Sequence, residues 1–275
     1  MSTQSMFDRL FSHYETDSPL GRWNPAAKAL AVLVVSLLLT AIFDPVTPLV
    51  VLILSILITV LLGRVSFVAM LAGLAPATAL AAGLVWTNLF FGRAEGSVWW
   101  HWGPFSLSEA SLIIGLSLGL RVLCFASYSL LFLTTTDPSR FILSLIQHFR
   151  VPYRFGYAML AVYRFLPMLG YEFLLIRGAQ RIRGVPQRRG VRGWVQEAVR
   201  YMIPLLAAAL RRAERVAIAM ESRGLGPGLH RTYYRYIPMR ALDVGAALAL
   251  IGVNALIIGV SWKLGVLRIW HGQLY

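Results

Sequence analysis

Five long runs of apolar residues constrain the fold of this chain more than any other feature of its sequence. The hydrocarbon core of a bilayer is about 30 Å thick, and a helix needs roughly 20 apolar residues to cross it. The runs are Ala26–Phe43, Val46–Leu62, Val65–Phe91, Ser108–Thr134 and Ala241–Trp262, and the second is marginal in length. The sequence therefore predicts an all-α integral membrane protein with about five transmembrane helices.

Composition excludes most other classes of protein. Hydrophobic residues make up 57% of the chain and charged residues only 14%, whereas about a quarter of the residues in a soluble domain are charged. Cys124 is the single cysteine, which excludes an intramolecular disulfide and a cysteine-based zinc site. The histidines are scattered without ligand spacing, so no metal site is expected: His13, His101, His148, His230 and His271. No catalytic triad, carboxylate pair or phosphate-binding glycine loop is evident, so we expect neither a catalytic residue nor a bound cofactor.

The segment between the fourth and fifth runs, Asp137–Arg240, differs in character from the rest of the chain. It holds 18 of the 26 basic residues, all of them arginine, and only five acidic residues, so it carries nearly all of the net charge of +14. Such a segment attracts anionic lipid headgroups or acidic protein surfaces, while its apolar stretches argue against nucleic acid as a partner. The predicted domains are therefore residues 1–136, 137–240 and 241–275.

Three helices are predicted within this arginine-rich segment: Pro138–Phe149, Phe155–Arg183 and Trp194–Arg223. The second contains Phe155–Ile176, which is long enough to cross a membrane, but its internal charges Arg164 and Glu172 favour a helix at the cytoplasmic interface. At about 100° per residue, the basic residues of the third helix project into an arc roughly 140° wide: Arg200, Arg211, Arg212, Arg215 and Arg223.

Basic residues in the short flanking loops predict the orientation. Arg9, Arg22, Lys28 and Arg64 fall on one side of the predicted spans, whereas the third loop has only Arg93. This pattern places the N-terminus and the arginine-rich segment in the cytoplasm and the C-terminus outside. The tryptophans of the third loop, Trp99, Trp100 and Trp102, are expected to anchor the chain at the opposite interface.

Two predicted helices end in closely similar sequences, Ile182-Arg183-Gly184 and Ser222-Arg223-Gly224, 40 residues apart. Each has an alanine four residues before the arginine, and a proline follows shortly after the glycine. The simplest interpretation is a pair of helix-end charges that favour the helix dipole. Because both ends lie in the one basic segment of a membrane protein, a shared binding role is the stronger hypothesis.

These motifs resemble those of the transmembrane T component of energy-coupling factor (ECF) transporters, which ends two cytoplasmic coupling helices in X-Arg-Gly. Asp17–Lys28 and Leu166–Leu169 are also similar to that family, the former particularly to its cobalt-uptake branch, CbiQ. The resemblance implies a multi-pass subunit of the bacterial cytoplasmic (inner) membrane that is not itself an enzyme. It also implies two ATP-binding-cassette ATPase partners, which hold ATP and Mg²⁺ and receive Arg183 and Arg223, and a substrate-binding membrane subunit.

The cargo and two features inside the membrane leave alternatives open. The resemblance favours cobalt uptake, and hence cobalamin biosynthesis, with nickel or a vitamin such as biotin as alternatives; an intramembrane lipid-modifying enzyme is the alternative from another class. Arg121 lies within the fourth run, where a charge either hydrogen-bonds inside the bundle or takes part in transport. Gly115 and Gly119 form a small-xxx-small pair suited to close packing of helices.

Overall fold

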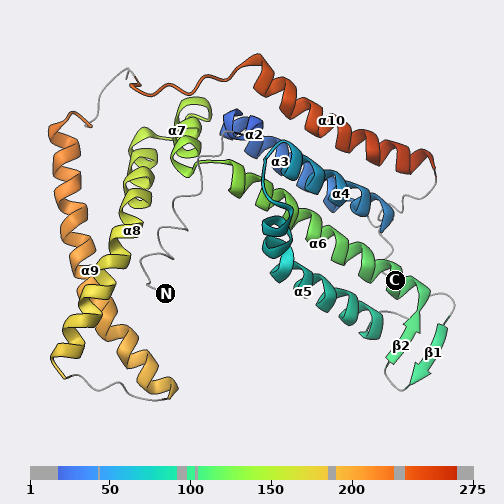
Figure 1. Cartoon of the computed structure of the whole chain (residues 1–275), viewed down its shortest axis with the longest axis horizontal. Coiled ribbons are helices and arrows are strands. Elements are labelled where there is room, and N and C mark those ends of the chain that lie inside the picture. Colours follow the sequence, from blue (N-terminus) through green and yellow to red (C-terminus); the bar gives the residue numbers. More distant parts are fainter. Residues whose placement is uncertain are drawn as a thin grey trace. The chain divides into compact units, whose positions relative to one another are not determined.

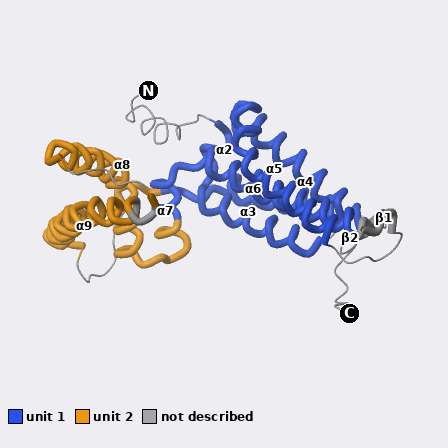
Figure 2. Tube along the Cα trace, turned by 90° about the horizontal axis from the view of Figure 1, so that it is seen from below, with its two compact units in different colours: residues 1–144, 237–275 blue, residues 145–236 orange. Residues whose placement is uncertain are grey.

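The computed structural model describes residues 18–42, 44–91, 98–102, 105–184, 190–225 and 233–264. The chain divides into two compact units, Met1–Ser144 with Ile237–Tyr275, and Leu145–Tyr236 (Figure 2). Several residues named in the sequence predictions lie outside the described residues: Arg9, His13, Asp17, Arg93, His230 and His271. The side chains of Trp99, Trp100, His101 and Trp102 also lie outside that description, so the predicted aromatic anchor stays a prediction.

The first unit is a bundle of helices that run alongside one another (Figure 1). Its helices are α2 (Pro19–Arg22), α3 (Pro25–Thr40), α4 (Val46–Leu61), α5 (Phe67–Phe91), α6 (Glu109–Thr135) and α10 (Ala241–Lys263). Each of the five predicted apolar runs forms one of the last five helices, which confirms the predicted all-α membrane architecture. The short helix α2 precedes them and was not predicted.

The helices of this bundle differ in length. Helices α5, α6 and α10 have 25, 27 and 23 residues and are apolar enough to cross a membrane. Helices α3 and α4 have 16 residues each, which corresponds to about 24 Å at 1.5 Å per residue. The first predicted run is therefore a shorter helix than expected, because the chain leaves the helix after Thr40 and turns toward Asp44.

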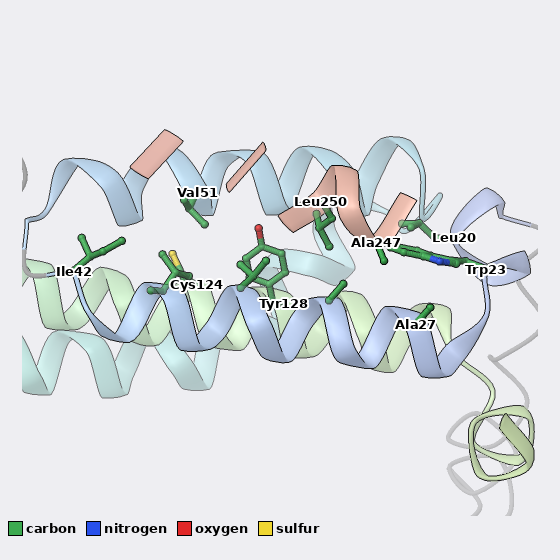
Figure 3. Close-up of a cluster of buried hydrophobic side chains, with 12 residues drawn as sticks. Leu20, Trp23, Ala27, Ile42, Val51, Cys124, Tyr128, Ala247 and Leu250 are labelled. Carbon is green, nitrogen blue, oxygen red and sulfur yellow. The ribbon is translucent and has the colours of Figure 1, made fainter. Parts of the chain in front are cut away.

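Buried polar contacts join α3, α4, α6 and α10. The Tyr128 hydroxyl of α6 donates to Asn254 Oδ1 of α10 over 3.0 Å, beside the apolar cluster drawn in Figure 3. The hydroxyls of Ser55 on α4 and Ser127 on α6 lie 2.6 Å apart. Helices in a bilayer gain little from burying apolar surface against one another, so contacts of this kind contribute to their association.

Lys28 connects three segments at the end of the bundle where α2 lies. The side chain is fully buried, and its Nζ donates to the carbonyl oxygen of Leu20 over 2.6 Å. The same Nζ donates to the carbonyl and hydroxyl oxygens of Thr135, each over 3.0 Å, and to the Thr136 hydroxyl over 3.2 Å. Lys28 is therefore an internal tie between α2, α3 and the end of α6 rather than an exposed charge flanking a span.

The predicted close packing at Gly115 and Gly119 is confirmed, and the partner helix is α5. A Cβ atom at Gly115 would lie 3.2 Å from the carbonyl oxygen of Val85, and one at Gly119 would lie 3.2 Å from that of Ala81. Both neighbours are backbone atoms, so an added Cβ would require the two helices to shift by a few tenths of an ångström. The two glycines thus allow α5 and α6 to approach more closely than any other residue would permit.

A two-stranded antiparallel hairpin follows α5, formed by β1 (Val98–Trp102) and β2 (Phe105–Ser108). Trp102 pairs with Phe105 in its register. The sequence prediction treated this stretch as a loop and missed both strands. The Gly-Pro pair between the two aromatic stretches is a turn signal that could have indicated a hairpin.

The second unit contains α8 (Tyr153–Ile182) and α9 (Val191–Ser222), and α7 (Pro138–His148) leads into it. All three predicted helices of the arginine-rich segment are found, with ends shifted by up to three residues. Gly156 of α8 packs against Ile146 of α7, where a Cβ atom would overlap the isoleucine side chain. Helix α8 is long and apolar enough to cross a membrane, so the interfacial placement of Phe155–Ile176 stays a prediction.

The boundary of the second unit lies a few residues inside the predicted segment. The first part of α7 is bonded within the first unit, because Arg140 donates to the Gly21 carbonyl over 2.9 Å. The Ser144 hydroxyl likewise donates to Asn24 Oδ1 over 2.8 Å. These two hydrogen bonds join residues 138–144 to the first unit.

Candidate functional site

Helix α8 ends at the first of the two predicted motifs. Ile182 is its last residue, and Arg183 forms the C-cap, whose N–H donates to the Ala179 carbonyl over 3.1 Å. Gly184 then takes φ +68° and donates its N–H to the Arg181 carbonyl over 3.0 Å. A left-handed residue directly after the cap closes the last turn of a helix, and only glycine adopts that conformation without strain.

Helix α9 ends in the same way at the second motif. Ser222 is its last residue, Arg223 forms the C-cap, and Gly224 takes φ +85°. The N–H of Leu225 donates to the Met220 carbonyl over 2.9 Å, which is the long hydrogen bond of a Schellman cap. The Ser222 hydroxyl donates to the Ala219 carbonyl over 3.0 Å, so serine here occupies a backbone acceptor of its own helix.

Both motifs therefore present an arginine at an exposed helix end that a left-handed glycine closes. Ile182 is 88% exposed, and Arg183, Gly184, Arg223 and Gly224 are also exposed. Neither the Arg183 nor the Arg223 guanidinium makes an ion pair or hydrogen bond with another residue of the described part of the chain. Each guanidinium thus has its donors available for a carboxylate, which it can bind in a two-point contact.

An ion pair joins the two helices that carry these ends. Arg212 Nη2 of α9 lies 2.6 Å from Glu172 Oε1 of α8, and the two side chains are only 17% and 22% exposed. The Arg212 guanidinium also lies over the ring of Phe165, 5.8 Å from its centroid. The ring of Phe173 meets that of Tyr201 edge-on at 5.6 Å. These contacts set the relative position of α8 and α9.

The predicted basic face of α9 is divided by this arrangement. Arg211 and Arg215 are exposed and Arg200 is partly exposed, whereas Arg212 points toward α8. Sequence periodicity placed all four in one arc but gave no sign that Glu172 is the partner of Arg212. The sequence does indicate that Glu172 needs a partner, because it is an acidic residue inside an apolar helix and a carboxylate that is not solvated must be paired.

Tyr201, whose ring contacts Phe173, also makes a hydrogen bond within α9. Tyr201 donates its hydroxyl to Glu197 Oε1 over 2.9 Å, one helical turn away. This hydrogen bond to the carboxylate raises the pKa of Tyr201 above its ordinary value.

Helices α8 and α9 expose many large apolar side chains. On α9 they recur every three or four residues along one face, at Val195, Val199, Met202, Leu206 and Leu210, and are 49–73% exposed. On α8 the exposed set includes Phe155, Met159, Val162, Leu166 and Leu175. Apolar faces of this extent occur where a protein contacts lipid or another subunit.

Arg121 makes the structural hydrogen bond that was one of its two predicted roles. Its Nη2 donates to the carbonyl oxygen of Ile42, just beyond the end of α3. The buried carboxylate of Asp44 lies nearby, where Oδ2 accepts from the Thr47 N–H over 2.7 Å. A role of Arg121 in transport is not required to explain its presence within the bundle.

The described residues also offer no cluster of three or more His, Cys, Asp or Glu side chains that could hold a metal ion. Each of the two helix ends offers an exposed guanidinium, which suits recognition of a carboxylate on another protein.

The model of the CbiQ family, described as a cobalt transport protein, matches residues 16–234. The chain belongs to the CbiQ family. It is 30% identical over 255 residues to the energy-coupling factor transporter transmembrane protein EcfT of Streptococcus thermophilus, a match that covers 88% of this chain and 94% of the relative. It is 32% identical over 255 residues to EcfT of Heliobacterium modesticaldum, covering 90% of this chain and 94% of the relative.

A third relative, EcfT of Bacillus subtilis, is 32% identical over 210 residues, covering 71% of this chain and 77% of that protein. The chain is therefore a transmembrane component of an ECF transporter, which confirms the resemblance inferred from its motifs. As a member of this family it is a multi-pass membrane protein and a non-catalytic transporter subunit. The alternative of an intramembrane lipid-modifying enzyme finds no support in this membership.

Proposed function

We propose that this T component couples two ATP-binding-cassette ATPases to a substrate-binding membrane subunit through the ends of α8 and α9. The observation that carries the proposal is the shared geometry of the two ends, in which an exposed C-cap arginine precedes a left-handed glycine. Arg183 and Arg223 would each bind acidic groups of one ATPase, and the ATPases would hold ATP and Mg²⁺. The exposed Arg211 and Arg215 and the partly exposed Arg200 would add favourable charge around these contacts.

Movement would pass between the two ends because α8 and α9 are bonded to each other. The Arg212–Glu172 ion pair and the Phe173–Tyr201 ring contact join them near their middles. The exposed apolar faces of the same helices would contact the substrate-binding subunit and lipid. Anionic headgroups would add to the attraction of the basic segment for the membrane surface.

The proposed orientation places the N-terminus and the arginine-rich segment in the cytoplasm of a bacterial inner-membrane protein, with the C-terminus outside. Basic residues gather at one end of the bundle and support this orientation. Arg22 is the last residue of α2. Arg64 lies at the same end of the bundle, because its neighbour Gly63 packs against Thr135 at the end of α6. Ser144 and Ile237, the residues of the first unit that adjoin the second in the chain, belong to the same end, because Ser144 bonds to Asn24 and Ile237 lines a cavity with Leu20.

Reversing both charges tests the coupling role. In the double variant Arg183→Glu and Arg223→Glu, carboxylates would repel the acidic groups of the ATPases, so co-purification of the ATPases and substrate uptake should be lost. Membrane insertion should be unchanged, because both residues are exposed. Uptake into proteoliposomes and pull-down of tagged ATPases measure the two effects.

The matched control is Arg154→Glu with Arg235→Glu, which makes the same change of charge at two other exposed arginines of the same unit. This control should keep uptake and assembly within about twofold of the parent chain. Normal assembly and uptake in the motif variant would refute the proposal. An equal loss in both variants would show that net charge, rather than the two helix ends, is recognised.

We further propose cobalt as the cargo, on the description of the matching family model and the CbiQ-like start of the chain. The assay is uptake of radiolabelled cobalt by the reconstituted transporter, in competition with nickel and biotin. Transport of biotin or nickel in preference to cobalt would refute this assignment. A result against cobalt alone would leave the coupling role unaffected. Pull-down of the ATPases measures coupling without any cargo, whereas the uptake competition measures the choice of cargo.

A further inference from the structure

A large cavity opens on the first unit between α2, α4 and α10. Its volume is about 760 Å³, within the range of about 300–1,000 Å³ that is usual for small-molecule sites. All of its lining residues belong to the first unit. It is separate from the two helix ends of the coupling proposal and does not depend on them.

One end of the cavity is basic. Arg22 from α2, Arg140 from α7 and Arg240 from the N-cap of α10 line it, and Asp243 is the acidic residue among the lining residues. The Asp243 carboxylate is already bonded, since it accepts from the backbone N–H of Asn24 over 3.3 Å and from that of Arg240 over 3.0 Å. Three arginines thus line this end together with one described carboxylate that has partners of its own, and one Arg140 nitrogen, Nη1, donates to the Gly21 carbonyl.

The remainder of the cavity is an apolar channel. Leu54 and Ile58 of α4 and its C-cap Leu62 line it, four residues apart and therefore on one face of that helix. On α10 the lining continues from Leu242 to Val253, about 16 Å at 1.5 Å per residue. Ala246 and Ala249 lie in this stretch, and their small side chains keep the channel open. Its length suits most of one extended acyl chain.

We propose that this cavity binds an anionic glycerophospholipid. The phosphate would be held by Arg22, Arg140 and Arg240, and one acyl chain would lie between α4 and α10. The order of the lining matches the order of a lipid molecule, because the charged residues lie at the helix ends and the apolar residues follow toward the middle of the bundle. Basic pockets between membrane helices bind anionic headgroups in this manner. A free phosphate would use the arginines and leave the apolar channel empty.

The proposal is tested on the full chain purified in mild detergent and exposed to phosphatidylglycerol or phosphatidylcholine. Native mass spectrometry should show one phosphatidylglycerol retained per chain in preference to phosphatidylcholine, and inorganic phosphate should not displace it. Each of Arg22→Gln, Arg140→Gln and Arg240→Gln should lower retention about fivefold. Ala249→Trp, which fills the channel without changing charge, should lower it as strongly.

Arg64→Gln is the matched control, because Arg64 lies at the same end of the bundle but not in the cavity. It should retain the lipid as the parent chain does, and helicity measured by circular dichroism must be unchanged in every variant compared. Equal retention of both lipids would overturn the proposal. So would equal losses in the control and the cavity variants, or full retention in Ala249→Trp. Displacement of phosphatidylglycerol by inorganic phosphate would also overturn the proposal, because the site would then bind an anion and not a lipid. If no lipid is bound and the cavity variants lose subunit assembly instead, the cavity is the site of a protein partner.

Discussion

The left-handed glycines that close α8 and α9 lead to a quantitative prediction about coupling. Gly184 and Gly224 have φ +68° and +85°, and among the described residues no heavy atom beyond the adjoining residues lies within 4 Å of the position that a Cβ would occupy at either glycine. A substitution there meets no neighbour, so its cost is the backbone strain alone. For alanine this cost is about 1–2 kcal/mol, which lowers the population of the closed helix end about 5- to 30-fold.

If Arg183 and Arg223 bind the ATPases only from this closed end, the measured Kd should rise by up to the same factor. We expect Gly184→Ala and Gly224→Ala each to weaken binding by about 5- to 30-fold, and the double variant to approach the product. Gly184→Asn should cost less, because asparagine adopts the left-handed conformation more readily than alanine. The assay is surface plasmon resonance of the purified ATPases on the chain held in lipid nanodiscs.

Gly178 provides the matched control, since it lies inside α8 and also has open space around it. Gly178→Ala should leave binding unchanged while favouring the helix by up to about 1 kcal/mol. If Gly184→Ala and Gly178→Ala bind the ATPases within twofold of each other, the closed end is not what the partner recognises. The explanation of the two motifs in terms of backbone geometry would then be wrong.

Three further predictions concern contacts within the chain and are measured by thermal unfolding of the purified protein. Arg212→Glu should lower stability by about 1–2 kcal/mol because it places two partly buried carboxylates together, and adding Glu172→Arg should restore most of the loss; no recovery would refute the pairing. Gly119→Leu should lower the unfolding temperature strongly because backbone atoms of α5 block the new side chain. Gly83→Leu, which lies in open space, should not, and similar unfolding temperatures of the two variants would contradict the close packing. Lys28→Met should cost about 2–4 kcal/mol, since it leaves several buried acceptors without a donor, and an unchanged unfolding temperature would show that the Lys28 contacts contribute nothing.

Most of the helical architecture follows from the sequence because the membrane imposes a strict requirement on the backbone. Every N–H and C=O group in the hydrocarbon must be satisfied within the chain, so an apolar run such as Ala241–Trp262 has no stable alternative to a helix. The ends of the shorter helices were less predictable. The helix that begins at Pro25 ends at Thr40, before the apolar run itself ends, because Arg121 and Asp44 bind the turn that follows.

The candidate site was predictable where it depends on local chemistry. An arginine followed by glycine at the end of a helical pattern is enough to predict a capped end, and the structure has such ends at Arg183 and Arg223. The Arg212–Glu172 pair was not predictable, because a single sequence does not say which faces of α8 and α9 meet. The same applies to the cavity lined by Arg140 and Arg240, whose residues come from segments about 100 positions apart.

The exposed apolar faces of α8 and α9 have a consequence for the life of the protein in the cell. A copy made in excess of its partners presents rows of leucine, valine and methionine that no part of the described chain covers. Surfaces of this kind attract chaperones and membrane proteases. A small rise in the fraction of molecules open to these proteins changes the abundance of the subunit several-fold. We therefore expect the orphan subunit to turn over quickly and the assembled one to persist, so that degradation itself adjusts the ratio of the subunits.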